Sequence, residues 1–414
     1  MGLRVVVVGA GLAGLAAADT IVRGGAEVVV LEARDRVGGR VHTKELPNGA
    51  LVELGAEFVL PGNTHVAALA ERLGLRLAPK GMRYGDREPR GGLGVERAGL
   101  LSALALVESA LRARRPDAPP LSARAFLDSL ALEPGAREAI LARLEVSCAA
   151  SADRVAAETL AGVAAHSEED CPGVAGGNQR IALRLAEELG SVVCLRSRVE
   201  RIEWSRRGVR VSAAGGELEA DRAILAVPAC VVSRIALAPG LPAHVAAALG
   251  RVEYGHAAKL FVPLAARPPA SAVLSVPERY WSWTAAGADG EIQSVASCFA
   301  GSAHALAGLG VRDGPGAWLE SLARLRPDLA LEPAGAVLST WDDDPLAGAA
   351  YSLRTAAGPG EDAFRLPDGP LHVAGEHSAG PYHALMEGAL RSGVRAAQEA
   401  LGRPSPPQET SARS

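Results

Sequence analysis

A strand, a glycine-rich turn, a helix and a second strand follow one another at the start of the chain, and this order restricts the fold more than any other feature. The four valines at positions 5–8 are typical of a strand buried on both faces. Gly9, Gly11 and Gly14 form a G-x-G-x-x-G pattern, an alanine-rich run indicates a helix, and a second valine strand ends on Glu32. The spacing predicts a βαβ unit that binds a dinucleotide.

Each part of this motif has a physical role in holding a pyrophosphate. Glycines let the backbone approach the ligand, and the helix that follows, expected from Leu15 to about Arg23, presents free N–H groups at its start to the negative charge of the ligand. Glu32 can accept hydrogen bonds from both ribose hydroxyls and would repel a 2′-phosphate. A membrane span is excluded as the alternative, because residues such as Asp19 and Arg23 interrupt the apolar run.

The stretch "RVGGR" at positions 36–40 extends the motif. Gly39 and Arg40 suit a further loop that crosses the pyrophosphate, with the guanidinium paired to a phosphate oxygen. Nicotinamide dehydrogenases do not usually carry this extension, whereas FAD proteins of the glutathione-reductase type do. The extension therefore favours FAD over NAD.

The composition is that of a soluble enzyme. The 414 residues carry a net charge of −4 without a basic tail, which gives no reason to expect a nucleic acid or a membrane as partner. Five cysteines without C-x-x-C pairing and nine histidines without clustering predict buried thiols and no metal site. No signal peptide precedes the strand at residue 4, which indicates a cytoplasmic location. The oligomeric state stays open, with a homodimer as one option.

The remaining patterns divide the chain into interleaved parts. Residues 192–228 indicate a β meander followed by a buried strand, and residues 369–402 indicate a strand, a glycine turn and a helix. We expect an α/β fold whose discontinuous Rossmann-type FAD-binding domain comprises residues 1–75, 175–235 and 366–403. An interleaved α+β substrate domain is expected over residues 76–174, largely helical, and 236–365, with a mixed sheet. Residues 404–414 are polar and rich in proline, and are expected to form a disordered tail.

With these motifs the chain resembles the flavin-containing amine oxidases, the superfamily of monoamine oxidases, polyamine oxidases and lysine-specific histone demethylases. The resemblance covers nearly the whole chain and is closest to the polyamine oxidase-like branch. It rests on the glycine motif with Glu32, "GGR" at 38–40, "ELGAEF" at 53–58, Lys259, "TWDDDPLAGAAYS" at 340–352 and "AGEHSAGPYHALMEGALRSG" at 374–393. The demethylases' extra N-terminal domain and long helical insertion find no room here, so a chromatin role is not expected.

The resemblance implies a set of residues around FAD. Glu32 would hold the adenosine ribose, Arg40 the pyrophosphate, and the backbone of Val199 the adenine. Gly55 and Ala56 would pass close to the flavin ring, and the N–H of Met386 would lie near flavin O2, where a helix start stabilises negative charge. The full set of cofactor-binding residues is Gly9, Gly11, Leu12, Ala13, Gly14, Glu32, Ala33, Arg34, Gly39, Arg40, Gly55, Ala56, Val199, Trp341, Gly375, Glu376 and Met386.

Lys259 is the clearest catalytic candidate. It is one of three lysines, with Lys44 and Lys80, and lies in the apolar stretch "YGHAAKLFVPL", where a buried charge is costly without a partner. The resemblance implies a bond through water to flavin N5, with Trp341 packed beside the flavin. The alternatives are a lysine that snorkels at a strand end and a tryptophan that only fills the core.

Two departures from the family pattern bear on the cofactor and the substrate. In covalently flavinylated monoamine oxidases a cysteine lies nine residues after the tryptophan, where this chain has Ala350, so we expect FAD to be non-covalent. Those enzymes also hold the amine between two aromatic rings. Tyr351 matches one ring, but Leu385 stands at the second position and Tyr382 lies three residues earlier, which argues against a small aromatic monoamine.

The reaction that the resemblance implies is the oxidation of an amine, with Lys259, Glu57 and Tyr351 as catalytic residues. Hydride transfer from the α-carbon to flavin N5 gives an imine, which water hydrolyses to a carbonyl compound and an amine, and dioxygen reoxidises the flavin to give hydrogen peroxide. Alternation along "VELGAEFV" predicts Glu57 at the mouth or wall of the cavity. There it could accept the proton of a substrate ammonium and favour secondary amines or polyamines; an ion pair with an arginine is the alternative.

Other classes of flavoprotein stay open as alternatives. L-Amino-acid oxidases share the scaffold but normally have an arginine close after the "ELGA" segment, where this chain has Glu57. Carotenoid desaturases and protoporphyrinogen oxidases share the nucleotide motif, but Lys259 and the spacing from Trp341 to Tyr351 argue against them. A non-enzymatic FAD-binding protein is the remaining option.

Overall fold

Five parallel strands from distant parts of the chain form the sheet that contains the glycine motif. The computed structural model describes residues 2–83, 85–115, 117–164, 171–366 and 369–403. The sheet has the order β19-β12-β1-β2-β8. Its strands are β1 (Arg4–Val8), β2 (Glu27–Leu31), β8 (Val193–Cys194), β12 (Arg222–Leu225) and β19 (Leu371–Val373).

Both faces of this sheet are covered, which explains the unbroken run of valines in β1. Val5 and Val7 pack against the helices α1 (Leu12–Arg23), α7 (Gln179–Leu189) and α12 (Met386–Ala400). Val6 and Val8 point to the opposite side, where they join the core formed with the meander. Alternate side chains of a strand face opposite sides, so a strand between two cores has to be apolar throughout.

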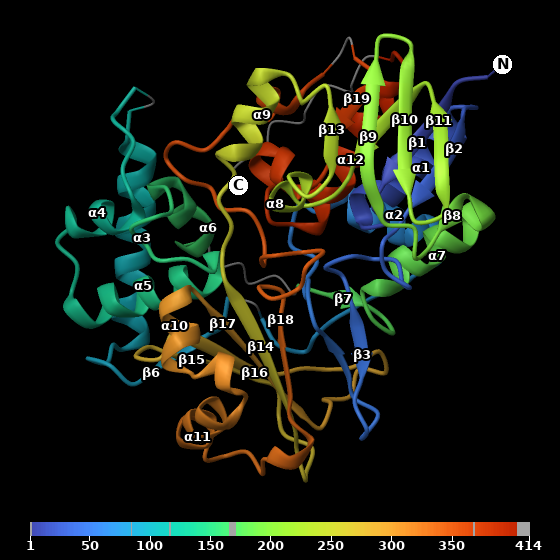
Figure 1. The fold of residues 1–414 in the computed structure, drawn as a ribbon. Coiled ribbons are helices and arrows are strands. Elements are labelled where there is room, and N and C mark those ends of the chain that lie inside the picture. The colour runs from blue at the N-terminus through green and yellow to red at the C-terminus, as the bar shows by residue number, and fades with distance from the viewer. Residues whose placement is uncertain (1, 84, 116, 165–170, 367–368, 404–414) are drawn as a thin grey trace.

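The meander forms a second sheet on the other side of the parallel one (Figure 1). Its order is β11-β10-β9-β13, and the expected antiparallel hairpins between residues 199 and 220 are confirmed. The strands are β9 (Val199–Ser205), β10 (Gly208–Ala213), β11 (Gly216–Ala220) and β13 (Ala236–Ala238). The helix α8 (Ala229–Val232) precedes β13, and α9 (Ala243–Gly250) follows it.

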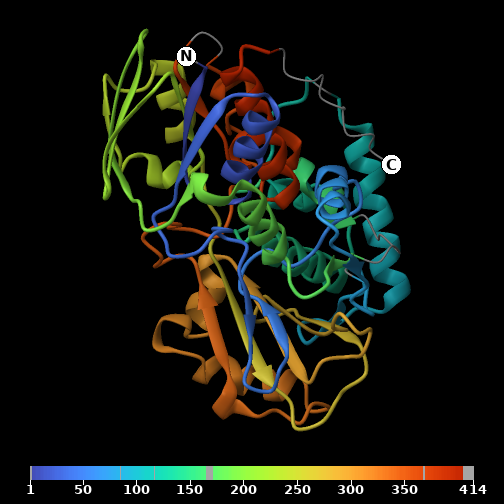
Figure 2. The same cartoon turned by 90° about the vertical axis from the view of Figure 1, so that its right-hand side faces the viewer.

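A six-stranded sheet lies at the opposite end of the molecule (Figures 1 and 2). Its order is β18-β14-β17-β16-β15-β6. The strands are β6 (Glu88–Arg90), β14 (Ala257–Pro263), β15 (Ser271–Ser275), β16 (Tyr280–Thr284), β17 (Val295–Gly301) and β18 (Val337–Thr340), with the helices α10 (Ala303–Gly308) and α11 (Gly316–Leu325). Lys259 lies in the middle of β14, which is hydrogen-bonded on both edges.

Four helices form a separate group beside this sheet (Figure 1). They are α3 (Arg97–Ala113), α4 (Ala123–Asp128), α5 (Pro134–Cys148) and α6 (Leu160–Ala164). The start of α5 is fixed locally, because Pro134 occupies its first turn and the Glu133 side chain accepts hydrogen bonds from the N–H groups of Gly135 and Ala136. Residues 76–174 were expected to be largely helical, and within the described residues of that range these helices lie between positions 97 and 164.

Two short strand pairs and one helix complete the fold. The pairs are β3 (Thr43–Glu45) with β4 (Leu51–Glu53) and β5 (Leu77–Ala78) with β7 (Gly173–Val174), and the helix is α2 (Thr64–Arg72). Among the helices of the described residues, none is both long and apolar enough to cross a bilayer. The expectation of buried thiols holds in part, since Cys171 and Cys298 are buried while Cys230 is exposed. The domain boundaries stay a prediction, and the expected tail at 404–414 lies outside the described residues.

The contact between α1 and α12 depends on a glycine. A Cβ added at Gly393 would lie 2.1 Å from the carbonyl oxygen of Ala13, far inside van der Waals contact. We predict that Gly393→Ala forces the two helices apart and lowers the free energy of unfolding by about 1–3 kcal/mol, the usual range for overpacking. Urea unfolding of the holoenzyme followed by circular dichroism measures the change.

Gly99→Ala is the matched control. Gly99 is exposed in the first turn of α3, and its added Cβ would meet only a Val95 methyl at 3.6 Å, an ordinary contact. The same substitution should therefore stabilise the protein, by up to about 1 kcal/mol from helix propensity. Equal effects of the two substitutions would contradict the close contact of α1 with α12.

Candidate active site

One cavity runs from the turn between β1 and α1 to the six-stranded sheet. Of the predicted catalytic and substrate residues, Lys259, Glu57, Tyr351 and Leu385 line it. The predicted cofactor-binding residues that line it are Gly9, Gly11, Leu12, Ala13, Glu32, Ala33, Arg34, Gly39, Arg40, Gly55, Ala56, Val199, Trp341, Gly375, Glu376 and Met386. Gly14 is not among the lining residues. A Cβ there would lie 1.9 Å from the Gly9 carbonyl oxygen, so Gly14 permits close packing of α1 on the turn instead.

The nucleotide end of the cavity presents an oriented carboxylate and a helix start. Glu32 follows β2, and its oxygens accept hydrogen bonds from Ala10 N at 2.7 Å and Arg34 N at 2.8 Å. No side chain caps the first turn of α1 after Gly11. The "GGR" loop crosses at this point, because Gly38 N donates to Ala10 O at 2.9 Å. First-turn N–H groups of this kind bind anionic ligands.

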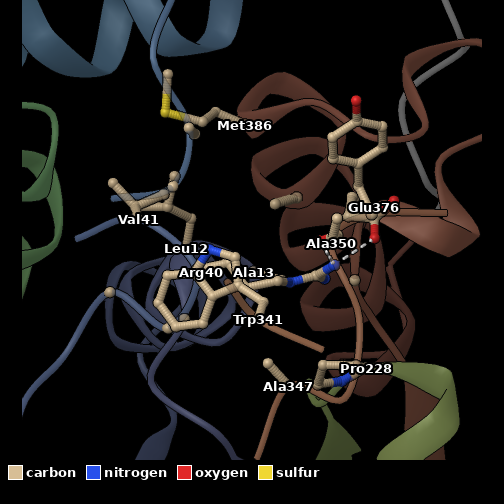
Figure 3. A pocket seen from close by; sticks show the side chains of 18 of the residues that line it. Leu12, Ala13, Arg40, Val41, Pro228, Trp341, Ala347, Ala350, Glu376 and Met386 are labelled. Carbon is tan, nitrogen blue, oxygen red and sulfur yellow. Dashed lines mark hydrogen bonds and ion pairs between the residues drawn. The ribbon is translucent and has the colours of Figure 1, made fainter. Parts of the chain in front are cut away.

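Arg40 lies in the middle of the cavity (Figure 3). Its Nη1 lies 3.0 Å from Glu376 Oε1 and donates to Ala350 O at 2.7 Å. Burial alone would raise the pKa of Glu376. The charge of Arg40 and hydrogen bonds from neighbouring residues lower it by more than burial raises it, so the pKa lies below its ordinary value and the carboxylate is ionised. The expected phosphate partner of Arg40 would therefore share the guanidinium with Glu376. A guanidinium has five N–H donors, which allows both contacts.

Buried polar atoms along this cavity fit a polar ligand. Nε1 of Trp341 and both ring nitrogens of His377 have no hydrogen-bond partner among the described residues, and both side chains line the cavity. Burial lowers the pKa of His377 to about 4, so its ring is neutral. α12 begins at Met386 without a side-chain cap, which adds a second uncapped helix start. Unsatisfied groups of this kind are costly without a ligand, so the site suits a long dinucleotide such as FAD.

Gly55 joins the nucleotide side of the cavity to the side with Glu57. A Cβ at Gly55 would lie 1.7 Å from the Arg40 carbonyl oxygen, and Ala56 N donates to the same oxygen at 3.3 Å. Only glycine allows this approach of two backbone segments. The ring of Trp341 follows on the same side, with its Cζ2 atom 3.5 Å from the position of the added Cβ.

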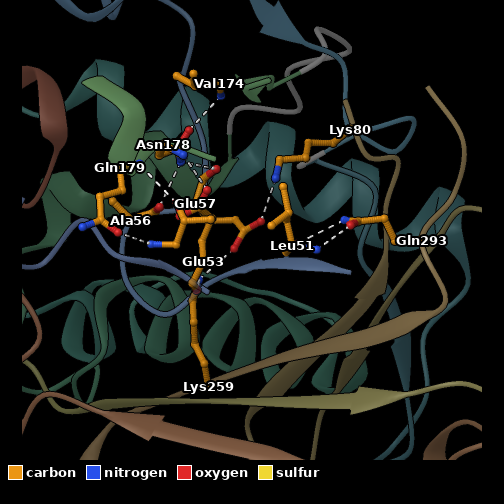
Figure 4. A network of polar contacts seen from close by, with 11 residues as sticks. Leu51, Glu53, Ala56, Glu57, Lys80, Val174, Asn178, Gln179, Lys259 and Gln293 are labelled. Atoms are coloured by element: carbon orange, nitrogen blue, oxygen red, sulfur yellow. Dashed lines mark hydrogen bonds and ion pairs between the residues drawn. The ribbon is translucent and has the colours of Figure 1, made fainter. Parts of the chain in front are cut away.

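A buried charged cluster lies where this segment meets β14 (Figure 4). Lys259 Nζ donates to Glu57 Oε2 at 2.8 Å and to the carbonyl oxygen of Glu53 at 2.7 Å. Lys80 Nζ donates to the other carboxylate oxygen of Glu57 at 2.9 Å. Asn178 holds the segment in place, because its Nδ2 donates to Ala56 O and Glu57 O, each at 3.0 Å.

The two carboxyl groups of this cluster have opposite pKa shifts. Burial would raise the pKa of Glu57, but Lys259 and Lys80 lower it to about 2. Burial and the Glu57 charge raise the pKa of Glu53 to about 6, although Lys80 and hydrogen bonds from Asn178 and Thr43 oppose the rise. A carboxylate whose pKa is lowered in this way is a weak base, which does not favour the expected role of Glu57 as acceptor of a substrate proton; that role stays a prediction. The partners of Glu57 are two lysines, where an arginine was the expected alternative.

Aromatic side chains that the sequence patterns did not single out form the wall beside Lys259. Trp281 and Trp283 stack with ring centroids 4.2 Å apart, and Phe58 lies 5.6 Å from Trp281. The Lys259 ammonium lies 5.9 Å from the centre of the Trp283 ring. The signal was present in "YWSWT", because residues two apart on a strand share a face. It did not reveal which face of β16 meets the cavity.

The sequence predicted an incomplete two-ring cage, and of its two tyrosines only Tyr351 lines the cavity. Tyr351 lines the cavity, and its hydroxyl donates to the Ser147 carbonyl oxygen at 2.8 Å, which fixes the ring against α5. Tyr382 does not line the cavity, and its ring lies under the Arg391 guanidinium at 4.1 Å. The turn before α12 directs Tyr382 to that helix, so its contacts do not favour the predicted substrate role, which stays a prediction. Arg87, also missed from the sequence, lines the cavity and lies 4.2 Å from the centre of the Trp281 ring.

Comparison with known proteins establishes the class. A family model described as flavin containing amine oxidoreductase matches residues 12–401. The chain therefore belongs to the flavin-containing amine oxidoreductases, and the resemblance inferred from its motifs is confirmed. It is an amine oxidase, and FAD is its cofactor.

Particular relatives cover the full length of the fold. The AofH protein of Mycobacterium tuberculosis, which carries the name of a flavin-containing monoamine oxidase, is 31% identical, over 95% of this chain and 96% of its own length. Putrescine oxidase of Kocuria rosea is 30% identical, over 96% of this chain and 95% of its own. A solved structure of putrescine oxidase bound to putrescine superposes with a TM-score of 0.80 at 25% identity, covering 97% of this chain and all of the other.

The buried Glu53 predicts a pH-dependent stability. Its side chain is 5% exposed, and its pKa is raised from 4.5 to about 6. A carboxyl group whose pKa rises on folding contributes stability below the unfolded pKa, and this stability is lost as the pH increases through the folded value. Relative to Glu53→Gln, the wild type should lose about 2 kcal/mol of unfolding free energy between about pH 4.5 and 6.5. Urea unfolding at a series of pH values measures this difference.

Glu45→Gln is the control for Glu53→Gln, since Glu45 is an exposed carboxyl in the same hairpin. Its pH profile should run parallel to that of the wild type. Parallel profiles for Glu53→Gln and the wild type would mean that the Glu53 carboxyl is not destabilised by its environment.

Proposed function

We propose that this protein oxidises an amine at the carbon next to nitrogen and forms a carbonyl compound, an amine and hydrogen peroxide. When bound, FAD supplies the redox chemistry, because it accepts a hydride from the amine and passes two electrons to dioxygen. The observation that carries the proposal is the continuity of one cavity from the glycine motif to Lys259 and the aromatic wall. A cofactor and a substrate can meet in such a cavity without crossing solvent.

The cofactor roles implied by the motifs fit the positions of the residues. Glu32 would hold the ribose, Arg40 with Glu376 and Gly375 the pyrophosphate and ribityl region, and Val199 the adenine. The layer that holds them is proposed to be of Rossmann type, with a parallel sheet and a glycine turn before α1. The first turn of α12 at Met386 would stabilise negative charge on the flavin ring.

Lys259 would act at the reacting end of the cavity. An ammonium group has three N–H donors, and two of them meet Glu57 and the Glu53 carbonyl. One donor is thus left, within the described residues, for a water or a reacting group in the cavity. Its positive charge would also favour the neutral form of the incoming amine, which is the form that can give up a hydride.

The aromatic wall points to amines with an apolar body. Phe58, Trp281, Trp283 and Tyr351 all line the cavity. The carboxylate of Glu57 lines the same cavity, and its charge is already shared by two lysines. A second substrate ammonium, as in a diamine, would gain little from it. We therefore place apolar monoamines, including the small aromatic monoamines that the sequence argued against, ahead of the polyamines expected from the sequence.

A second candidate function rests on Arg87. The arginine that an amino-acid oxidase needs is absent after the "ELGA" segment, but the guanidinium of Arg87 lines the cavity beside Trp281 and donates to Ser147 Oγ at 2.9 Å. A guanidinium can bind a carboxylate through paired hydrogen bonds. Oxidation of an amine that carries a carboxylate is therefore the alternative to oxidation of a simple amine.

FAD should dissociate when the protein is denatured. Ala350 lines the cavity at the position where a cysteine would be needed for a thioether, and its side chain has no nucleophile. Acid precipitation should leave the yellow flavin in the supernatant, as measured by its absorbance. Flavin that stays with the precipitated polypeptide would overturn the non-covalent assignment.

A peroxide-coupled assay with matched substrates tests the function. We predict that 2-phenylethylamine is oxidised, and that Lys259→Met keeps FAD but slows flavin reduction or reoxidation by roughly 10²-fold. Absence of flavin reduction by every amine tested, under anaerobic conditions, would overturn the proposal.

L-Phenylalanine differs from 2-phenylethylamine only by its carboxylate, so the pair separates the two candidates. A preference for L-phenylalanine that Arg87→Met removes, with oxidation of 2-phenylethylamine unchanged, would support the amino-acid oxidase. A preference for the simple amine in both proteins would support the first candidate.

A further inference from the structure

We propose that Lys80 is a positioning residue for Lys259 and acts on it through the shared carboxylate of Glu57. This inference rests on the proposed function, in which Lys259 lies beside the reacting end of the flavin. It assigns a role to a residue that does not itself line the cavity, whereas Glu57 and Lys259 do. Figure 4 shows the three side chains and the backbone that supports them.

The carboxylate of Glu57 bridges the two lysines. Lys80 Nζ contacts Oε1 at 2.9 Å, and Lys259 Nζ contacts Oε2 at 2.8 Å, so each ammonium has an oxygen of its own. The side chains of all three residues are at most 15% exposed. A carboxylate held by one cation could rotate about its terminal bond. With a cation on each oxygen, its plane is fixed, and with it the position of the Lys259 ammonium.

Lys80 is itself fixed by the surrounding backbone. It follows β5, and its carbonyl oxygen accepts a hydrogen bond from Ala286 N at 2.7 Å, just after β16. Its side chain passes over Gly173 in β7, where an added Cβ would lie 2.8 Å from the Lys80 Cε atom. The Lys80 ammonium and the Lys259 ammonium thus reach Glu57 from opposite sides of the segment that contains it (Figure 4).

The choice of residue type supports a specific role. The chain has 43 basic residues, of which only Lys44, Lys80 and Lys259 are lysines, yet two of these three meet at one carboxylate. An arginine would tend to occupy both carboxylate oxygens with its planar fork. A lysine is a point charge that bonds one oxygen and leaves the other for Lys259.

The consequence for the reaction is electrostatic. Paired with Glu57 alone, Lys259 would have its charge largely cancelled within hydrogen-bond distance. Lys80 adds a second positive charge beside the same carboxylate. The net charge of the cluster formed by Lys80, Lys259, Glu57 and Glu53 is therefore one unit more positive than it would be without Lys80. The pKa of Lys80 is raised, because Glu57 and Glu53 outweigh the effect of burial, and Lys80 therefore stays charged. Positive potential at this place favours a flavin that accepts negative charge.

The midpoint potential of FAD in the holoenzyme is the decisive measurement, since it does not depend on knowing the substrate. We expect Lys80→Met to shift this potential to a more negative value, in the same direction as Lys259→Met. Lys80→Gln keeps a hydrogen-bond donor without the charge and should behave like Lys80→Met. Lys80→Arg keeps the charge, but its planar fork can occupy both oxygens of Glu57, so it should recover only part of the wild-type potential. Lys44→Met, at an exposed site in β3, should leave the potential unchanged.

Stopped-flow reduction by an amine gives a second readout. We expect Lys80→Met to slow flavin reduction by about tenfold, the order expected for loss of a unit charge about 12 Å from the reacting atoms at an effective dielectric constant of about 20. The amine concentration for half-maximal rate should stay near the wild-type value, because Lys80 does not line the cavity. A structural role alone would not give a potential shift that charge restores.

The outcomes separate this inference from the proposed function. A shift in Lys259→Met without one in Lys80→Met or Lys80→Gln would overturn the role of Lys80 and leave the proposed function intact. Absence of a shift in Lys259→Met as well would overturn both the role of Lys80 and the assignment of Lys259 to the flavin. A potential in Lys80→Arg as negative as that of Lys80→Met, while FAD stays bound, would also overturn the inference, because the retained charge would then have no effect.

Discussion

The approach of Gly55 to the carbonyl oxygen of Arg40 is the constraint on which the rest of the site depends. With only 1.7 Å between that oxygen and the position of a Cβ, no side chain can separate the two backbones. The segment that follows β4 is therefore held against the loop that crosses the nucleotide motif. Its next residues reach the six-stranded sheet, where Glu57 meets Lys259. One short segment thus joins the part of the cavity that suits FAD to the part that suits a substrate.

Two further close backbone contacts at glycines fix the helices beside the cavity. Gly14 brings α1 onto the β1 turn, and Gly393 brings α12 onto α1. These contacts aim two uncapped helix starts, at Leu12 and Met386, at the same cavity from different parts of the chain. Anions are stabilised at such helix starts. The glycines therefore serve the electrostatics of the site by fixing where the helices begin.

The charged cluster and the aromatic wall give the substrate end of the cavity its character. The relatives include proteins named for putrescine, which carries two amino groups. In this chain Glu57, whose carboxylate lines the cavity, already balances Lys80 and Lys259, and the surface beside it consists of Trp281, Trp283 and Phe58. Burial of an apolar body against these rings would then contribute more binding free energy than a second ammonium. Similar folds can thus differ in substrate through a few side chains.

The sequence by itself determined the local elements of this protein. The valine run, the glycine spacing and Glu32 predicted β1, α1 and β2, and residues 369–402 predicted β19, a glycine turn and α12. These elements were predictable because strands, turns and helices depend on residues close together in the chain. Only the tertiary structure decided the contents of the cavity. Glu57 meets Lys80 and Lys259, 23 and 202 residues away, and Arg40 meets Glu376. The positions of Arg87, Trp281 and Tyr382 depend on which faces of distant strands and helices come together. The periodicity of a sequence shows which side chains share one face of a helix or strand, but the packing of the whole chain decides what that face contacts.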